Sequence, residues 1–429
     1  MLILKKIENL NYIISTFKNR KNKESLEVEK SVKDILNKVK NEGDKALIEY
    51  TQLFDKVKLD NLVVSYDELK EAASLVDDKF YQALEEAKKN IEDYHKKQKQ
   101  NDYIFFKRNG IYLGQKVTPI EKVGIYVPGG TAAYPSTVLM DVIPAKIAGC
   151  NEISMVTPPN KKGKINPYIA AAALITGVDK VYLVGGAQAI GALAYGTESI
   201  NAVDKIVGPG NIFVATAKKI VYGDVDIDMI AGPSEILVIA DKNAKAEFVA
   251  ADMLSQSEHD KLASSILITT SKELYIKVNE EISKQIEHLE RKEIIKESLK
   301  NNSFALVMSS IEEAIEISNK IAPEHLELMV EEPMKYLGMV KNAGSIFLGY
   351  NTPEPIGDYF GGTNHVLPTN STARFFSALS VESFVKKSSF IHYSKEAILE
   401  NGEKIMLLAE KEGLTAHKNS IKVRLDLNE

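Results

Sequence analysis

Short apolar runs alternate with helical segments through the middle of the chain. Runs rich in β-branched residues predict four strands, at residues 123–127, 153–156, 181–184 and 205–207. The segments between them are apolar around much of their surface, as at 166–177, and each ends on glycine or proline. This alternation indicates a parallel sheet that carries helices on its faces. Residues 123–230 are therefore predicted to form one doubly wound α/β unit.

A second series of apolar runs follows, and helices again separate most of them. These runs predict strands at 236–240, 265–269, 305–308, 326–330 and 345–348. Before both series, residues 1–110 are rich in Lys, Glu and Asp, and their apolar spacing predicts a charged, mostly helical region. In the tail, a predicted helix runs from Lys395 to Gly413, and residues 421–425 then alternate strictly between apolar and polar. That alternation predicts a small, half-exposed tail element.

Together these patterns predict an α/β fold with two doubly wound, Rossmann-like parallel-sheet domains, a helical N-terminal region and a small C-terminal tail element. The length agrees, because 429 residues exceed the roughly 250–300 at which a single core stops growing. The predicted divisions are an N-terminal extension at 1–24, a discontinuous α/β domain at 25–122 plus 235–380, an inserted α/β domain at 123–234 and a tail domain at 381–429.

Composition narrows the class of protein. A formal net charge of -5 argues against nucleic acid as the main partner. Cys150 is the only cysteine, so an intrachain disulfide and a cysteine-based zinc cluster are both ruled out, and a reducing cytoplasm fits best. No apolar run approaches the ~18 residues that a membrane span needs, and the N-terminus lacks the apolar core of a signal peptide. We expect a cytoplasmic protein with no membrane partner.

Two segments carry candidate metal and proton-transfer chemistry. Gln256 and His259 are three residues apart, so on one helix they would share a face and could reach a single metal ion; an ordinary helix end is the alternative. Pro323 ends the preceding helix, which places Glu324 and His325 at a strand entrance. A carboxylate and an imidazole there could serve as two bases, or form an ordinary surface pair. Neighbours on a regular strand point to opposite faces, so both can act only if the backbone turns.

Glycine clusters mark a candidate nucleotide site. They lie at 128–130, 185–188 and 208–211, each after a predicted strand of the first unit, where ligands collect in open parallel sheets. None is the G-x-G-x-x-G fingerprint, so tight strand-to-helix turns are the alternative. Cys150 follows the C-terminus of an apolar helix, whose dipole would raise the pKa of its thiol, and we interpret it as a packing residue. We interpret His365 as loop packing and assign no role to His95, His288 and His392.

Taken together, these segments closely resemble the L-histidinol dehydrogenases, zinc enzymes that use NAD. The resemblance runs from about residue 25 to the tail and is most specific from Asp228, through Ala231-Gly232-Pro233-Ser234-Glu235, to His259. Further matching segments are 321–326, 357–365 and 414–418. The resemblance implies that the inserted domain binds NAD and that the discontinuous domain carries the metal and the catalytic residues.

Particular residues take their roles from this resemblance. The implied metal ligands are Gln256, His259, Asp358 and His417. The implied bases are Glu324 and His325. The implied NAD contacts are Tyr126, Gln188 and Asn211. The implied substrate contacts are Ser234, Gln256, His259, His325, Asp358, Glu412 and His417.

The implied reaction is the oxidation of L-histidinol through L-histidinaldehyde to L-histidine with two NAD, the last step of histidine biosynthesis. One zinc per subunit is implied, although manganese or cobalt would suit the same donors. The resemblance also implies a homodimer with shared sites, in which the neighbouring subunit supplies His417; a return of the tail within one chain would give the same ligand count. Two other functions stay open: a zinc hydrolase that uses Glu324 without nucleotide, and a dehydrogenase of the same family that oxidises another amino alcohol and keeps every metal and cofactor residue.

Overall fold

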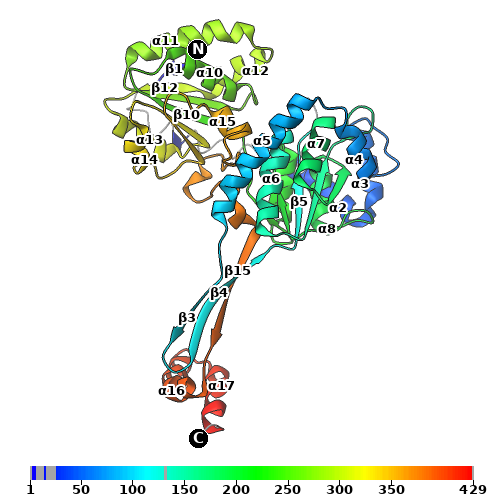
Figure 1. Ribbon diagram of the computed structural model, residues 1–429, viewed down its shortest axis with the longest axis vertical. Coiled ribbons are helices and arrows are strands. Elements are labelled where there is room, and N and C mark those ends of the chain that lie inside the picture. The colour runs from blue at the N-terminus through cyan, green and yellow to red at the C-terminus, as the bar shows by residue number, and fades with distance from the viewer. Residues whose placement is uncertain (1, 6–13, 16–25, 130–132, 428–429) are drawn as a thin grey trace.

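The computed structural model describes residues 2–5, 14–15, 26–129 and 133–427. Two parallel-sheet units lie side by side, and a long arm extends from them to the C-terminus (Figure 1). The predicted α/β fold with two doubly wound sheets is confirmed. Within the described residues, no helix is both long and apolar enough to cross a membrane.

The first sheet has the order β2-β7-β6-β5-β8-β9 and is parallel except for β2. Its central strands are buried on both faces, as expected for strands that carry helices on either side. In chain order the strands are β2 (Val63–Val64), β5 (Lys122–Tyr126), β6 (Glu152–Thr157), β7 (Lys180–Leu183), β8 (Lys205–Val207) and β9 (Asp226–Ile227). All the strands predicted in this unit lie within one residue of an observed strand.

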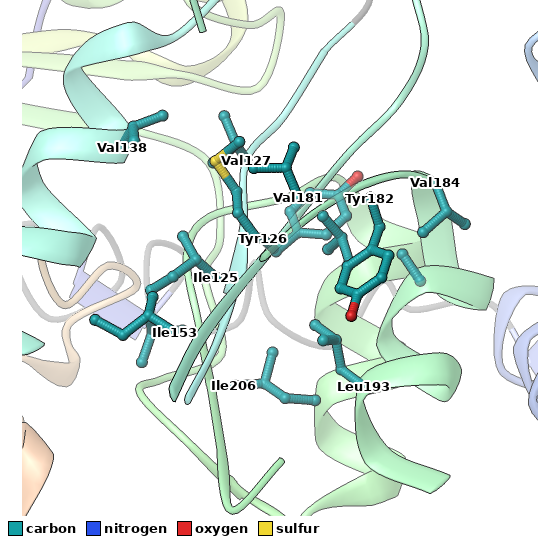
Figure 2. Packing of buried hydrophobic residues seen from close by; sticks show 14 of the residues in the cluster. Ile125, Tyr126, Val127, Val138, Ile153, Val181, Tyr182, Val184, Leu193 and Ile206 are labelled. Atoms are coloured by element: carbon teal, nitrogen blue, oxygen red, sulfur yellow. The ribbon is translucent and has the colours of Figure 1, made fainter. Parts of the chain in front are cut away.

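Helices cover both faces of this sheet, and apolar side chains from the strands and helices interlock between them (Figure 2). Several helix ends follow from the sequence: Asn166 caps α7, Pro167 begins it, and Gly177 ends it in the left-handed conformation. The helices are α2 (Leu26–Glu42), α3 (Asp44–Phe54), α4 (Tyr66–Ala73), α5 (Asp78–His95), α6 (Pro135–Ala148), α7 (Pro167–Thr176), α8 (Gly186–Tyr195) and α9 (Ile212–Val221), with the 3-10 turn η3 (Lys96–Gln98) after α5.

The N-terminal helices belong to this first unit, not to the second. Residues 25–122 are predicted from the sequence to group with 235–380, but Val32, Leu47 and Ile91 lie in the same buried cluster as the strands of the first sheet. Strand β2 also joins this sheet, beside β7. The grouping was wrong because an amphipathic helix shows which of its faces is buried but not which sheet covers that face.

The second sheet is parallel throughout and has the order β1-β12-β11-β10-β13-β14. Along β10, Ile236 and Val238 face one apolar cluster, and Leu237 and Ile239 face the other, as the two-residue period of a strand requires. The strands are β1 (Ile3–Leu4), β10 (Glu235–Ala240), β11 (Ser264–Thr269), β12 (Phe304–Val307), β13 (His325–Met329) and β14 (Ser345–Leu348). Strand β1 lies within the predicted N-terminal extension, most of which falls outside the described residues.

Helices again cover both faces of the second sheet. They are α10 (Ala246–Ser257), α11 (Lys272–Gln285), α12 (Lys292–Asn302), α13 (Ile311–Ile321), α14 (Pro333–Leu337) and α15 (Glu354–Tyr359). The part of the chain between β10 and β15 also contains the 3-10 turns η4 (Ile286–His288), η5 (Thr372–Arg374) and η6 (Val381–Phe384). Residues Val366, Leu379 and Phe384 pack back into the core of the first unit, so the chain returns there before it enters the arm.

The arm combines two distant parts of the sequence. It is an antiparallel sheet of β3 (Tyr103–Lys107), β4 (Ile111–Pro119) and β15 (Val385–His392), followed by α16 (Lys395–Lys411) and α17 (Thr415–Asp426). In the arm the structure corrects one prediction: β3 lies where we expected mostly helix. Residues 421–425, predicted as a small, half-exposed tail element, are part of helix α17, which packs against α16, where Leu425 lies over Gly402.

Candidate active site

Glu324 and His325 lie between the end of α13 and the start of β13, and His325 is the first residue of β13. Helix α13 ends at Ile321, and Ala322 takes the left-handed conformation with φ 54°, which turns the backbone before Pro323. Glu324 therefore precedes the strand, so strand alternation does not force its side chain away from that of His325. His325 Nδ1 lies 3.7 Å from Glu324 Oε2. The backbone turn that both bases would need is present.

The imidazole of His325 is held in one tautomer. Its Nδ1–H donates to the carbonyl oxygen of Glu235 at 2.9 Å, which leaves Nε2 with a free lone pair. Among the described residues, Nε2 has no hydrogen-bond partner although it is buried. Burial lowers the pKa of His325, which favours the neutral imidazole. A neutral histidine with a free Nε2 is suited to accept a proton.

Glu324 is fixed by the same residue of the neighbouring strand. Its Oε2 accepts the backbone N–H of Glu235 at 2.8 Å, so Glu235 orients both candidate bases through its own backbone. Burial raises the pKa of the Glu324 carboxyl well above its ordinary value, and the carboxylates around it add to that rise. A carboxylate with a raised pKa is a stronger base once it is ionised.

Two further carboxylates approach His325 from α15. Glu354 and Asp358 are four residues apart and therefore share one face of this helix. Glu354 Oε1 lies 3.9 Å and Asp358 Oδ1 lies 4.0 Å from His325 Nε2. Burial raises the pKa of Glu354 to about 7 and that of Asp358 to about 6. Sequence reasoning missed Glu354: its spacing to Asp358 indicates a shared helix face but not that this face meets His325.

Gln256 and His259 lie beside this cluster but do not share a helix. Helix α10 ends at Ser257, so His259 follows the helix, and the expected helical spacing of the pair is wrong. Gln256 is 1% exposed, and neither of its amide atoms has a hydrogen-bond partner in the described part of the chain. His259 is exposed. The N–H of His259 donates to the carbonyl oxygen of Gln256 at 3.4 Å, so His259 follows directly on the end of α10.

The donors left without partners fit a metal ion. A buried polar atom that lacks a hydrogen bond is costly, and His325 Nε2 and Glu354 Oε1 are in this state close to Asp358 among the described residues. Gln256 Oε1 is in the same state, and the hydroxyl of the neighbouring Ser255 donates to Glu354 Oε2 at 3.2 Å. His325, Glu354 and Asp358 each offer a ligand atom within 4.8 Å of the others. Nitrogen and oxygen donors of this kind suit zinc, and manganese or cobalt would accept them as well.

Two other histidines connect the site to the first unit. His365 donates from Nδ1 to the carbonyl oxygen of Asp358 at 3.0 Å, and its Nε2 lies 3.3 Å from Thr137 Oγ1 on α6. This agrees with a packing role. His95 is fully buried, with Nδ1 2.9 Å from the carbonyl oxygen of Ile91 and Nε2 3.4 Å from Asn364 Nδ2. No role is assigned to His95 from the sequence, and its burial between α5 and Asn364 is compatible with packing.

The candidate NAD contacts lie at the carboxyl ends of strands in the first sheet. Tyr126 ends β5, and its hydroxyl accepts the N–H of Gly186 at 3.1 Å. Gln188 is buried in the first turn of α8, and Asn211 caps α9 by accepting the N–H groups of Phe213 and Val214. These positions agree with the ligand crevice expected of a doubly wound sheet, although Gly130 of the first glycine cluster lies outside the described residues.

The remaining candidate residues are divided between the site and the arm. Ser234 directly precedes β10 and is half-buried. Glu412 follows α16 and His417 lies on α17, both exposed at the far end of the arm from α15 (Figure 1). One chain therefore does not bring His417 to Asp358. The structure gives no support to a return of the tail within the same chain.

Cys150 has no part in the site. It is buried after α6, and burial raises the pKa of its thiol to about 12. A thiol that stays protonated is a poor nucleophile. The interpretation of Cys150 as a packing residue agrees with its environment.

Comparison with known proteins gives the family of this chain. A family model described as histidinol dehydrogenase matches residues 18–425. Histidinol dehydrogenase from Clostridium acetobutylicum is 61% identical over 409 residues, which cover 95% of this chain and 95% of that protein. The corresponding protein from Listeria monocytogenes is 54% identical and covers 97% of this chain and 98% of its own length.

A solved structure agrees with these relatives. The crystal structure of histidinol dehydrogenase from Elizabethkingia anophelis matches with a TM-score of 0.94 at 43% identity, and the match covers 100% of this chain and 98% of that one. The resemblance inferred from the motifs is thereby confirmed, and the site built around Glu324 and His325 lies in the matched region. The chain belongs to the histidinol dehydrogenase family of oxidoreductases.

Proposed function

We propose that the protein oxidises L-histidinol through L-histidinaldehyde to L-histidine, with two NAD in succession and one zinc ion per subunit. The observation that carries the proposal is the tautomer and hydrogen bonding of the His325 imidazole. Its Nδ1 is held by the carbonyl oxygen of Glu235, and its Nε2 is free and faces the carboxylates of α15. Membership of the family supports the substrate, and the reaction would be the last step of histidine biosynthesis.

Gln256, His259 and Asp358, together with His417 of the partner subunit, would hold the zinc ion. Bound there, zinc would supply a template for the imidazole and amino nitrogens of the substrate. His325 and Glu354 lie close enough to act as ligands too. We assign His325 to proton transfer instead, because its Nε2 is the one ring nitrogen not already hydrogen-bonded and cannot serve both roles.

The two bases would act in sequence on the substrate carbon. His325 Nε2 would take the proton of the alcohol in the first oxidation. Glu324 would then take a proton from the water molecule that attacks the aldehyde, with His325 assisting again. Tyr126, Gln188 and Asn211 would position NAD, which supplies the hydride acceptor when bound. The bases differ in chemical kind but share one backbone anchor at Glu235, which keeps them together.

A homodimer completes this site. His417 and Glu412 lie at the end of the arm, so only a second copy of the chain could present them to Asp358. The arm carries large apolar side chains that are exposed in the single chain, among them Phe105, Phe106 and Ile391. Exposed apolar surface on an extended element is typical of a subunit interface.

The reaction is tested by NADH production from L-histidinol, before and after chelation and again after zinc is restored. We expect two NADH per L-histidinol, no NADH after chelation and recovery with zinc. A hydrolase would release product without any absorbance at the NADH wavelength. If the zinc-loaded protein made no NADH from L-histidinol but did so from another amino alcohol, the assignment of the substrate would be wrong.

Replacing Gln256 by alanine tests the ligand set. We expect Gln256→Ala to weaken zinc binding by about 100-fold or more, because changes in outer-shell residues alone cost about 10- to 100-fold. Competition with a chromogenic chelator measures this affinity. The matched control is Gln285→Ala. Gln285 is the last residue of α11, and its amide donates to the carbonyl oxygen of Glu247, so this variant should bind zinc normally. Unchanged affinity in Gln256→Ala would show that Gln256 is not a ligand.

A further inference from the structure

A buried ion pair lies beneath the candidate cofactor loop at 208–211. Lys218 of α9 contacts Asp228, which follows β9, and their side chains are only 2% and 1% exposed. Lys218 Nζ also donates to the carbonyl oxygen of Gly208 at 2.9 Å. Asp228 Oδ2 accepts the N–H of Gly208 at 2.9 Å, and Oδ1 accepts the N–H of Met229 at 2.6 Å. The pair thus binds both polar backbone groups of Gly208.

Stability alone does not account for this pair. Desolvation of two charges offsets much of their attraction, so apolar residues of similar volume often stabilise a protein as well or better. The pair does fix geometry. Gly208 has φ 111°, and a Cβ there would lie 2.2 Å from the carbonyl oxygen of Tyr126. The loop is therefore pressed against the end of β5, where a small displacement would move Asn211 as well.

The same pair anchors the chain that leads to the bases. Asp228 and Met229 begin the crossing from the first sheet to β10, and this crossing ends at Glu235. The backbone of Glu235 holds Glu324 at 2.8 Å and His325 at 2.9 Å. Midway, the N–H of Gly232 donates to Thr369 Oγ1 at 2.7 Å. One ion pair therefore fixes the start of the cofactor loop and the start of the segment that positions both bases.

Asp141 completes the cluster from α6. It is fully buried, and neither of its carboxylate oxygens has a hydrogen-bond partner among the residues described. A Cβ on Gly208 would lie 3.1 Å from Asp141 Oδ2, so this carboxyl group also borders the loop. Burial, with a further contribution from Asp228, raises the pKa of Asp141 well above its ordinary value. A protonated Asp141 would leave Asp228 as the carboxylate that pairs with Lys218.

We propose that Lys218 and Asp228 are positioning residues that hold the cofactor loop in register with Glu324 and His325. They act through the backbone of Gly208 and Met229 and do not touch the substrate. This inference rests on the proposed function, because it assumes that NAD lies over the loop at 208–211. Loss of the pair would weaken NAD binding and slow turnover, and would leave the zinc site as it is.

The main variant replaces the pair without leaving one charge buried alone. Lys218→Met by itself would leave the Asp228 carboxylate without a partner, so this variant combines Lys218→Met with Asp228→Leu. Asp228→Asn is the second variant: it takes the carboxylate away from Lys218 but keeps a side-chain oxygen that can accept from the Lys218 ammonium. The matched control is Lys205→Met. It removes the partner of Asp226, an ion pair of 2.7 Å between β8 and β9 that does not contact the loop. All variants are checked for zinc content and thermal unfolding.

We expect the double variant to raise the KM for NAD by about tenfold or more and to lower kcat, with zinc content unchanged. Asp228→Asn should shift both constants in the same direction by less, and Lys205→Met should change neither. Constants within twofold of wild type in a folded double variant or in Asp228→Asn, or an equal effect of Lys205→Met, would overturn the proposal.

Equilibrium binding of NADH to each variant separates this inference from the proposed reaction. This measurement needs no substrate, so it remains readable even if wild-type protein fails to oxidise L-histidinol. In that case the proposed reaction is wrong, while a weaker affinity for NADH in the double variant than in Lys205→Met still supports the role of the pair. Equal affinities in these two variants refute that role.

Discussion

Replacing His325 by asparagine should lower kcat for L-histidinol oxidation by about 10²- to 10⁴-fold, the usual contribution of a positioned base. Asparagine is close in size and can still donate to the carbonyl oxygen of Glu235, but it offers no basic Nε2 toward the substrate. Zinc content should stay at the wild-type level, because the proposed ligands are other residues. Steady-state kinetics and metal analysis of the same preparation measure both quantities.

His288→Asn is the control for this substitution. His288 is exposed in the 3-10 turn after α11 and is neither a proposed ligand nor a proposed base, so the kinetics and zinc content of this variant should equal those of wild type. Loss of zinc from His325→Asn would contradict our assignment. It would instead favour an ion held by His325, Glu354 and Asp358, whose ligand atoms lie within 4.8 Å of one another. Another group would then have to serve as the base.

The central strands of both parallel sheets could be predicted because they are buried on two faces. Such strands appear as short apolar runs between turn residues, and the bounds predicted for 205–207 agree with β8. The two-residue edge strands β1, β2 and β9 were not predicted. Strand β3 was missed although residues 103–106 form a short apolar run of aromatic and β-branched residues. All residues of β3 are exposed and it pairs only with β4, and its run lies inside a stretch whose charge and apolar spacing favoured helix.

Parts of the candidate site could also be predicted from the sequence. The turn at Pro323 indicated that Glu324 and His325 stand at a strand entrance, and this is where they lie. Sequence could not show what holds them, because the shared anchor at Glu235 depends on the register between β10 and β13, where Ile236 is opposite His325. Glu354 was missed for a similar reason: only the fold brings α15 against the start of β13.

Shared sites predict that two inactive variants will complement each other. His417→Ala would remove the ligand that a subunit gives to its partner, and His325→Asn would remove a subunit's own base. Each homodimer should be essentially inactive. A heterodimer of the two keeps one complete site, with His325 from one subunit and His417 from the other, so its activity should be about half that of wild type.

Co-expression with two different affinity tags and purification through both isolates this heterodimer. The control is a heterodimer of wild type and His325→Asn, which also keeps one complete site and should match it. If His417 instead served its own subunit, each chain of the mixed dimer would carry one defect, and the heterodimer would be as inactive as its parents. The position of α17 at the far end of the arm from α15 favours complementation, because His417 can reach a copy of Asp358 only across a subunit boundary.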